Sequence, residues 1–282
     1  MGTKLKELTK RVFVAIWGIP LLLILSYLGS YYFFALILVI NGVTLFEFYS
    51  IYKEKQVYPY RWLGISLGSI FLIFTYYNLF LEMRFLVFAG FILVLLSQLR
   101  KQHGIATYNM AITFAGLIYI SGFLTTLFYL RLHFVDYFQA QAGVSEYLGG
   151  KFLIVLWISI WVCDTAAYFG GRAFGKHKLA PVISPNKTIE GGIFGLIFGI
   201  ITFVLLGVLL LPPLQVEYLW LSGIIVGVFG QLGDLVESRF KRDTGVKDTS
   251  TILPGHGGFL DRFDSIIFIS PFLFLVFHYL KF

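Results

Sequence analysis

Nine long runs of apolar residues, separated by shorter polar segments, make up most of the chain. They lie near Val12–Leu28, Tyr32–Ile51, Trp62–Phe80, Phe85–Leu99, Met110–Leu130, Phe152–Phe169, Ile193–Leu211, Tyr218–Val236 and Ile266–Leu280. A helix of about 20 apolar residues is long enough to cross the hydrocarbon core of a membrane. The pattern therefore predicts an all-α fold, a polytopic integral membrane helical bundle of about nine transmembrane helices.

The positions of Lys and Arg predict how this bundle is oriented. With the N-terminus inside, the cytoplasmic segments hold all of the 22 Lys and Arg residues except Arg84, Arg131, Lys151 and Lys281. Cytoplasmic loops of membrane proteins carry the excess of positive charge. We therefore expect an N-in, C-out topology.

Composition narrows the class of protein further. Hydrophobic residues make up 58% of the chain and charged residues only 13%, whereas soluble domains carry about 25% charged residues. The single cysteine, Cys163, excludes an internal disulfide. We expect a multi-pass membrane protein that has no nucleic-acid partner. Its size and compact N-terminus favour a bacterial inner membrane.

The chain has two unequal parts. Residues 1–150 hold about five predicted spans, joined by short loops without recognisable chemistry. Residues 151–282 hold two long cytoplasmic loops rich in Gly, Pro, Lys, Arg and Asp, so we expect the functional region there. Glycines recur at four-residue spacing in the spans that begin at Ile193 and Tyr218, which favours close packing of helices within the bundle. A homodimer face stays open as the alternative.

The first polar cluster, Asp164–Gly192, connects two predicted spans. Pro185 and the surrounding glycines predict a fixed, irregular loop, and this loop carries several Lys and Arg residues. Thr188 stands where the next helix is expected to begin, and a helix N-terminus attracts phosphate through its free backbone N–H groups. The segment Gly170–Lys176 also matches the start of a phosphate-binding P-loop, but His177 replaces the required Ser or Thr, so we reject that interpretation.

The second polar cluster, Asp234–Asp264, begins inside an apolar run. A carboxylate at membrane depth costs roughly 2.5–3.5 kcal/mol on insertion scales, so it is usually functional. Asp234, Glu237 and Ser238 share one face of the predicted helix, because they are three and four residues apart. Mg2+ takes one or two carboxylates and completes its shell with phosphates and water. Asp234 and Asp261 would suffice as its protein ligands.

Each feature alone has a simpler explanation. A basic cytoplasmic loop usually reflects topology and attraction to anionic lipids, and a lone intramembrane aspartate is as often an ion-path or helix-pairing residue as a metal ligand. Glu47, in the second run, is expected to face a wet or helix-paired position. The conjunction of a carboxylate at depth, basic loops and glycine turns on one side of the membrane favours a site for a cation and anionic phosphates.

The second cluster resembles the signature of the phosphatidate cytidylyltransferase family, also called the CDP-diglyceride synthase family. The residues that match it are Ser238, Lys241, Arg242, Lys247, Asp248, Ser250, Leu253, Pro254, His256, Gly257, Gly258, Asp261, Arg262 and Asp264. The first cluster is similar to the upstream pattern of this family. Its matching residues are Asp164, Ala167, Tyr168, Gly171, Arg172, Gly175, Lys176, Ser184, Pro185, Asn186, Lys187, Thr188, Glu190 and Gly191.

The resemblance implies an activity and a set of site residues. The reaction would convert CTP and phosphatidate to CDP-diacylglycerol and pyrophosphate, at a cytoplasmic-facing site in the membrane. Mg2+ would bind Asp234 and Asp261, and whether a second cation such as K+ joins it is open. The other residues expected to act in catalysis are Lys187, Lys241, Arg242, Lys247, Asp248 and His256. Those expected to bind substrate are Arg172, Lys176, Ser184, Asn186, Lys187, Thr188, Glu190, Ser238, Gly257, Gly258, Arg262 and Asp264.

Two other functions stay open at this point. A CTP-dependent kinase of polyprenol or another lipid alcohol would need the same metal and basic loops, together with a base for the alcohol. An ion-coupled transporter would use Asp164 and Asp234 as a relay, but it should spread its charges across the membrane. This sequence concentrates its charges on one face of the membrane, which disfavours the transporter. With the family resemblance, we therefore expect the partners to be CTP, phosphatidate and membrane lipid.

Overall fold

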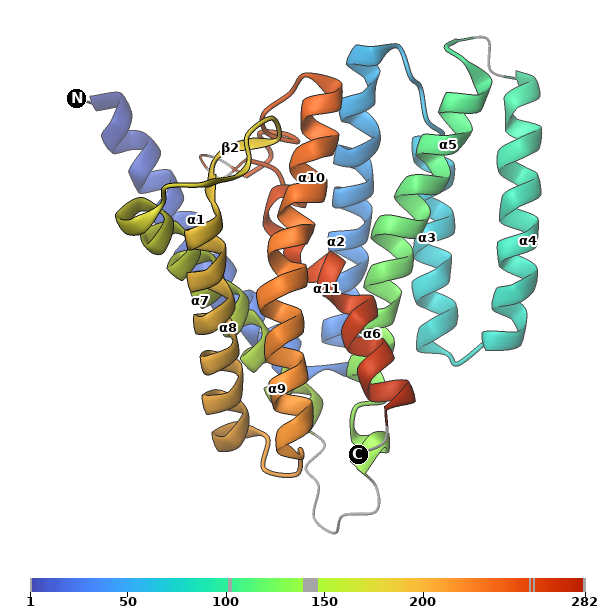
Figure 1. The fold of residues 1–282 in the computed structure, drawn as a ribbon. Helices are drawn as coiled ribbons and strands as arrows, with labels where there is room; N and C mark the ends of the chain where they lie inside the picture. Colours follow the sequence, from blue (N-terminus) through green and yellow to red (C-terminus); the bar gives the residue numbers. More distant parts are fainter. Residues whose placement is uncertain (1, 101–102, 139–146, 254, 256, 281–282) are drawn as a thin grey trace. The chain divides into compact units, whose positions relative to one another are not determined.

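The computed structural model describes residues 2–100, 103–138, 147–253, 255 and 257–280. Figure 1 shows its helices and the one hairpin found among these residues. The α-helices are α1 (Gly2–Leu28), α2 (Ser30–Ile51), α3 (Arg61–Tyr76), α4 (Phe80–Ser97), α5 (Ala106–Gly116), α6 (Phe123–Leu132), α7 (Leu148–Phe174), α8 (Ile189–Leu210), α9 (Val216–Ile225), α10 (Gln231–Thr244) and α11 (Leu260–Tyr279). The π-helical segments are η3 (Leu117–Gly122) and η5 (Val226–Gly230), the 3-10 turns are η1 (Tyr52–Lys55), η2 (Gln98–Arg100) and η4 (Val135–Phe138), and the strands are β1 (Lys178–Ala180) and β2 (Ser184–Thr188).

The helices agree with an all-α membrane protein. Within the described residues, 6 helical segments are long and apolar enough to cross a membrane: Ser30–Lys55, Phe80–Arg100, Ala106–Leu132, Leu148–Phe174, Ile189–Leu210 and Val216–Thr244. Two shorter apolar helices are Val14–Leu28 and Arg61–Tyr76, and the last predicted run lies in α11. Every predicted run therefore overlaps a helix, while the number of spans and their orientation stay predictions.

The turn between α3 and α4 lies earlier than the hydrophobic pattern indicates. The third apolar run extends to Phe80, but α3 ends at Tyr76 and α4 already begins at Phe80. Asn78 between them has a φ of 56°, a left-handed conformation that asparagine tolerates better than most residues. The apolar side chains around Asn78 continue through this turn, so hydropathy alone does not reveal it.

Contacts divide the chain into two compact units. Unit 1 comprises Met1–Leu22, Tyr31–Tyr129 and Lys241–Phe263, and unit 2 comprises Leu23–Ser30, Leu130–Phe240 and Asp264–Phe282. Most of the second polar cluster, from Lys241 onward, therefore belongs to the same unit as the N-terminal helices.

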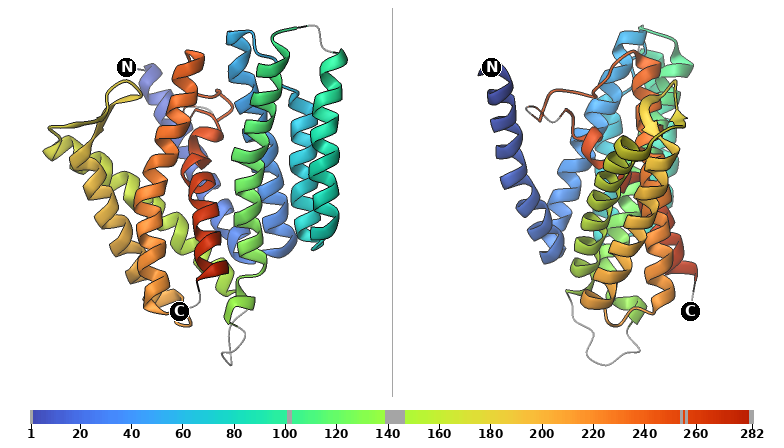
Figure 2. Two further views of the ribbon diagram at one scale, coloured as in Figure 1. Left: turned by 45° about the vertical axis from the view of Figure 1, so that its right-hand side comes forward. Right: turned by 60° about the vertical axis from the view of Figure 1, so that its left-hand side comes forward.

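In unit 1, α3, α4 and α5 lie side by side (Figure 2), and α3 and α5 also pack against η3. Leu67, Val94 and Leu117 form a buried cluster where these helices meet. Polar contacts join the helices as well: Ser121 Oγ donates a hydrogen bond of 2.7 Å to Asn41 Oδ1, and both side chains are buried. Hydrogen bonds of this kind strengthen helix pairing in a membrane.

In unit 2, α7 packs along α8, which also packs against α9 and η5. A Cβ on Gly191 of α8 would lie 2.6 Å from the carbonyl oxygen of Ala167 in α7. A Cβ on Gly223 of α9 would lie 2.9 Å from the Cα of Ile200 in α8. These approaches are possible only because glycine lacks a Cβ, which confirms the prediction of close helix packing within the bundle.

The π-helical segment η5 interrupts a run that the hydrophobic pattern presents as one helix. Its carbonyl oxygens find side-chain partners in unit 2: Gln231 Nε2 donates to Gly227 O at 2.6 Å, and Ser265 Oγ donates to Gly230 O at 3.1 Å. Segments of this type are frequent at functional sites. This one directly precedes the first turn of α10, which carries Asp234.

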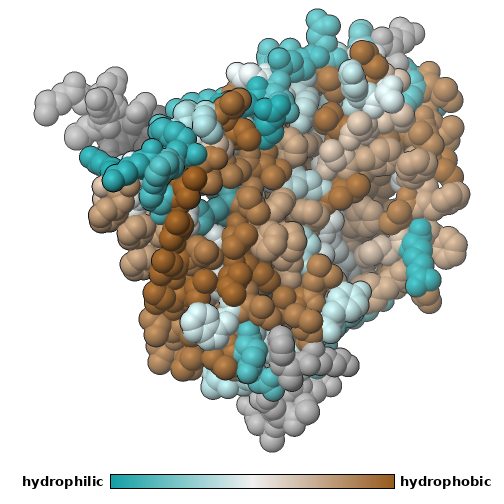
Figure 3. Space-filling view, in the orientation of Figure 1, coloured by the Kyte–Doolittle hydropathy of each residue, from teal (hydrophilic) through white to brown (hydrophobic). Residues whose placement is uncertain are grey.

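The segment after α7 is an antiparallel hairpin, and the prediction of an irregular loop was wrong. Lys178 pairs with Thr188 and Ala180 with Ser184. Ile183 N donates to Ala180 O at 3.2 Å and closes a four-residue turn. Pro181 is the second residue of this turn, the position at which proline is favoured. Pro185 is tolerated because an edge strand need not donate from every residue. Figure 3 shows hydrophilic residues in the region of this hairpin and a largely hydrophobic surface along α8.

Candidate active site

An ion pair joins the two polar clusters within unit 2. Lys187 Nζ, on β2, lies 2.6 Å from Asp234 Oδ2, in the first turn of α10, and both side chains are partly exposed. Ser238 Oγ donates to Asp234 Oδ1 at 3.2 Å, so the predicted helical face is present. The hairpin thus places an ammonium group directly on the carboxylate that the sequence predicts at membrane depth.

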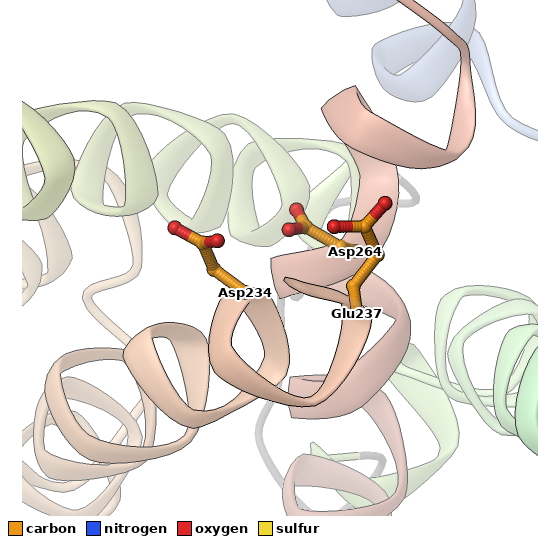
Figure 4. A group of neighbouring side chains, drawn as sticks. All are labelled: Asp234, Glu237 and Asp264. Carbon is orange, nitrogen blue, oxygen red and sulfur yellow. The ribbon is translucent and has the colours of Figure 1, made fainter. Parts of the chain in front are cut away.

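Three carboxylates gather around this point. Asp234 and Glu237 extend from α10 and Asp264 from α11 (Figure 4). One oxygen from each lies within 4.8 Å of the others, and Glu237 is only 1% exposed. Carboxylates this close repel one another, and a cation between them lowers that energy. An all-oxygen donor set is also the one that Mg2+ prefers, so these residues fit such an ion.

The base of the hairpin is fastened to the start of α8. The Glu190 carboxylate accepts from the backbone N of His177 at 3.2 Å and lies 2.6 Å from its Nδ1. The Thr188 side chain accepts from Gly191 N at 3.1 Å and caps the helix, which confirms the predicted helix start. These contacts fix the strand that carries Lys187. The substrate contacts predicted for Thr188 and Glu190 stay predictions.

In unit 1, the C-terminal signature folds around Asp261. Lys241 Nζ lies 2.6 Å from Asp261 Oδ1, and both side chains are largely buried. Asp261 Oδ2 accepts hydrogen bonds from Gly258 N at 2.7 Å and from Thr249 N and Oγ1, each at 3.0 Å. A carboxylate with this many donors is held in one orientation.

Two glycines make this wrapping possible. Gly257 has a φ of 82°, which is strained for other residues. A Cβ on Gly258 would overlap Thr249 Oγ1 and press on the Glu47 carboxylate. The glycine turn of the signature therefore serves close packing inside the loop. Pro254 and His256 lie outside the described residues, so the predicted role of His256 stays a prediction.

The remaining predicted residues are mostly at the surface. In unit 2, Ser184 is partly buried and the exposed ones are Arg172, Lys176 and Asn186. In unit 1, the exposed ones are Arg242, Lys247, Asp248 and Arg262. The predicted pairing of Asp234 with Asp261 joins residues of different units and stays a prediction.

Hydropathy and helical spacing do not reveal the roles of Glu47 and Glu237. Glu47 lies in α2 and is 0% exposed. It accepts hydrogen bonds from the segment of unit 1 that joins α10 to α11, residues 245–260, which we call the signature loop. A carboxylate inside an apolar run was its only signal. Helical spacing predicts that Glu237 shares the face of Asp234, but it does not reveal that Asp264 from α11 completes the group of carboxylates.

Comparison with known proteins adds a family assignment. The sequence profile of the Cytidylyltransferase family matches residues 9–280. The phosphatidate cytidylyltransferase of Bacillus subtilis (strain 168) is 34% identical over 276 residues, which cover 96% of this chain and 97% of that protein. Proteins of the same name from Staphylococcus haemolyticus (strain JCSC1435) and Staphylococcus aureus (strain COL) are 49% and 48% identical over 150 and 152 residues. These two alignments cover 53% of this chain and 56% of each relative.

Proposed function

Because the chain belongs to the cytidylyltransferase family, we propose that it transfers the cytidylyl group of CTP to phosphatidate, forming CDP-diacylglycerol and pyrophosphate. The Bacillus subtilis relative, which is similar over almost the whole chain, supports this choice of lipid. The structural observation that carries the proposal is the contact of Lys187 with Asp234, where the hairpin adds a cation to a group of three carboxylates.

The reaction needs no nucleophilic side chain. A phosphomonoester has a second pKa of about 6, so phosphatidate is largely dianionic at neutral pH. One of its oxygens attacks the α-phosphorus of CTP, the bond from that phosphorus to the β-bridging oxygen breaks, and pyrophosphate leaves with the electron pair. The main barrier is repulsion between two anions, which the protein must offset by positive charge held in place.

The chain provides this charge from both polar clusters. On the hairpin side, Lys187, Arg172 and Lys176 would bind phosphate oxygens, with Ser184, Asn186 and Thr188 as neutral donors. From the signature, Lys241, Arg242 and Lys247 would do the same, and Arg262 lies exposed beside Asp261. Asp248, His256, Ser238 and Asp264 would support the site.

We expect Asp234 to hold Mg2+ in unit 2, with Glu237 and Asp264 beside it. In unit 1, the assignment of Asp261 as a metal ligand rests on the family resemblance. When bound, Mg2+ neutralises phosphate charge and orients the phosphate oxygens. Lys187 would then share the charge of Asp234 with the cation and direct its remaining donors to the nucleotide.

The proposal includes a location. About nine spans with the N-terminus inside would place both polar clusters at the cytoplasmic face of a bacterial inner membrane. Phosphatidate would then reach the site from the inner leaflet and CTP from the cytosol.

The reaction is tested by product analysis. Purified protein in detergent would be incubated with phosphatidate, Mg2+ and CTP labelled at the α-phosphate, and the lipid would then be extracted. We expect label in the organic phase and release of pyrophosphate. If only CTP labelled at the γ-phosphate transferred its label, with a prenol as acceptor, the chain would be a lipid kinase and the proposal would be wrong.

Asp234→Asn tests the site. The variant keeps the size of the side chain but removes the charge that Mg2+ and Lys187 require, so we expect turnover to be abolished while membrane insertion is unchanged. Asp136→Asn is the matched control, because it makes the same change of side chain outside both polar clusters. Asp136 lies in the segment after α6, where it contacts His133. Near-normal activity of Asp234→Asn would remove this residue from the metal site.

A further inference from the structure

Glu47 connects an N-terminal helix to the signature loop within unit 1. Its side chain is 0% exposed, and its two oxygens divide the donors of the loop between them. Oε1 accepts from Ser250 Oγ at 2.5 Å and from Phe259 N at 3.0 Å. Oε2 accepts from Leu260 N at 2.7 Å and lies 3.2 Å from Thr249 Oγ1. All of these partners lie more than 200 residues away along the chain.

Glu47 supplies the hydrogen-bond acceptors that the N-terminus of α11 lacks in its own sequence. The carbonyl of Phe259 accepts the first hydrogen bonds of this helix, from Arg262 N and Phe263 N, so Phe259 is its N-cap residue. A phenylalanine side chain cannot accept the orphan N–H groups, as Ser, Thr or Asp would. Glu47 satisfies two of these groups from another helix, and a carboxylate is favoured at the positive end of the helix dipole. The start of α11 is therefore fixed by α2.

One hydroxyl links Glu47 to Asp261. Thr249 Oγ1 lies 3.2 Å from Glu47 Oε2 and 3.0 Å from Asp261 Oδ2. Because a hydroxyl has one hydrogen, Thr249 donates to one carboxylate at a time, and its backbone N holds Asp261 continuously. Gly258 donates to Asp261 and packs against Glu47 without room for a Cβ. Glu47 thus binds the residue that follows each of the two groups orienting Asp261: Ser250 follows Thr249, and Phe259 follows Gly258.

We propose that Glu47 is a positioning residue for the transfer reaction: it holds the signature loop so that Asp261 and Lys241 face the phosphates in one fixed arrangement. The inference rests on the role proposed above for Asp261. It gives the N-terminal helices a part in catalysis, because the loop keeps its shape only while α2 supplies the two acceptor oxygens of Glu47.

Glu47→Gln is the decisive variant. Glutamine has the same size but only one acceptor oxygen, so its amide group would face two donors of the loop. We expect kcat to fall roughly 10²-fold, as for a displacement of about 1 Å at the reacting groups. The half-saturating Mg2+ concentration should rise by roughly 10–100-fold, the range for changing a group that orients a metal ligand. Hydrogen exchange of the Phe259 and Leu260 amides, measured without Mg2+ or substrate, should become faster.

Thr44→Val is the matched control on the same helix. Thr44 is buried one turn before Glu47, and its hydroxyl donates to the carbonyl of Ile40 in α2 itself. We expect this variant to keep the kcat, the Mg2+ dependence and the amide exchange of the wild-type enzyme. Glu47→Asp keeps both oxygens but is one methylene shorter, so it should fall between the wild type and Glu47→Gln.

The outcomes separate this proposal from the assignment of Asp261. If Asp261→Asn is inactive while Glu47→Gln has near-normal kcat and Mg2+ dependence, the proposal for Glu47 is wrong. If Asp261→Asn stays active, the role of Asp261 fails, and the proposal fails with it. If Glu47→Gln does not fold, Glu47→Asp decides the question. Fast amide exchange with wild-type kinetics in that variant would show that the loop need not be held.

Discussion

At the residue scale, each carboxylate proposed to bind metal is in contact with one lysine. Lys187 contacts Asp234 in unit 2 and Lys241 contacts Asp261 in unit 1, each at 2.6 Å. An ammonium group has three donors, so either lysine can hold its aspartate and a phosphate oxygen together. We infer that these lysines orient the carboxylates as well as bind substrate.

Lys187→Met tests this inference. The variant leaves Asp234 without its ammonium partner and removes one phosphate-binding cation, so kcat/KM should fall roughly 10²–10³-fold, as when one donor to a reacting anion is lost. Lys178→Met is the matched control, since Lys178 lies exposed on the neighbouring strand of the same hairpin and the variant changes the net charge equally. Steady-state kinetics with CTP and phosphatidate would measure both. Equal losses in the two variants would mean that only general positive charge matters.

At the element scale, small residues decide how closely the helices of unit 2 approach. Gly223 places its Cα against the backbone of Ile200, which cannot move aside as a flexible side chain can. The π-helical segment η5 follows in the same stretch, and it ends at the residue before α10. The first turn of α10, with Asp234, therefore depends on how this stretch packs against α8.

Gly223→Ala should destabilise the protein. The added methyl would lie 2.9 Å from the Cα of Ile200, and overpacking of this kind costs about 1–3 kcal/mol. Gly42→Ala is the matched control, because a Cβ there would meet nothing within 4 Å, and alanine in an open helix position is favoured by roughly 0.5–1 kcal/mol. Thermal unfolding in detergent should show a lower Tm for Gly223→Ala and an unchanged or higher Tm for Gly42→Ala. A Tm for Gly223→Ala equal to the wild type would contradict the close approach.

At the scale of the whole molecule, the proposed chemistry draws on both compact units. Unit 2 holds the hairpin, Asp234, Glu237 and Asp264, whereas unit 1 holds Lys241, Asp261 and the loop bound by Glu47. Both polar clusters must face the same side of the membrane for CTP to reach them. The distribution of Lys and Arg predicts that this side is the cytoplasm.

The orientation can be measured with single cysteines. Cys163 is the single native cysteine and is buried, so Cys163→Ala provides a silent background. Glu54→Cys in η1 and Glu82→Cys in α4 alter exposed positions without changing the Lys and Arg pattern. A membrane-impermeant maleimide should label Glu82→Cys in intact cells and Glu54→Cys only after permeabilisation. The reverse pattern would overturn the N-in topology.

Sequence alone was enough to predict the membrane class, the helical runs, the family and the face shared by Asp234 and Ser238. These follow from hydropathy, helical spacing and short motifs, which are properties of neighbouring residues. Three features became known only from the folded structure: the predicted irregular loop is a hairpin with Lys187 on Asp234, Asp264 lies beside Glu237, and Glu47 holds the signature loop. These are contacts between distant segments. Such contacts depend on how donors and acceptors of packed helices line up, and a local sequence pattern does not predict this alignment.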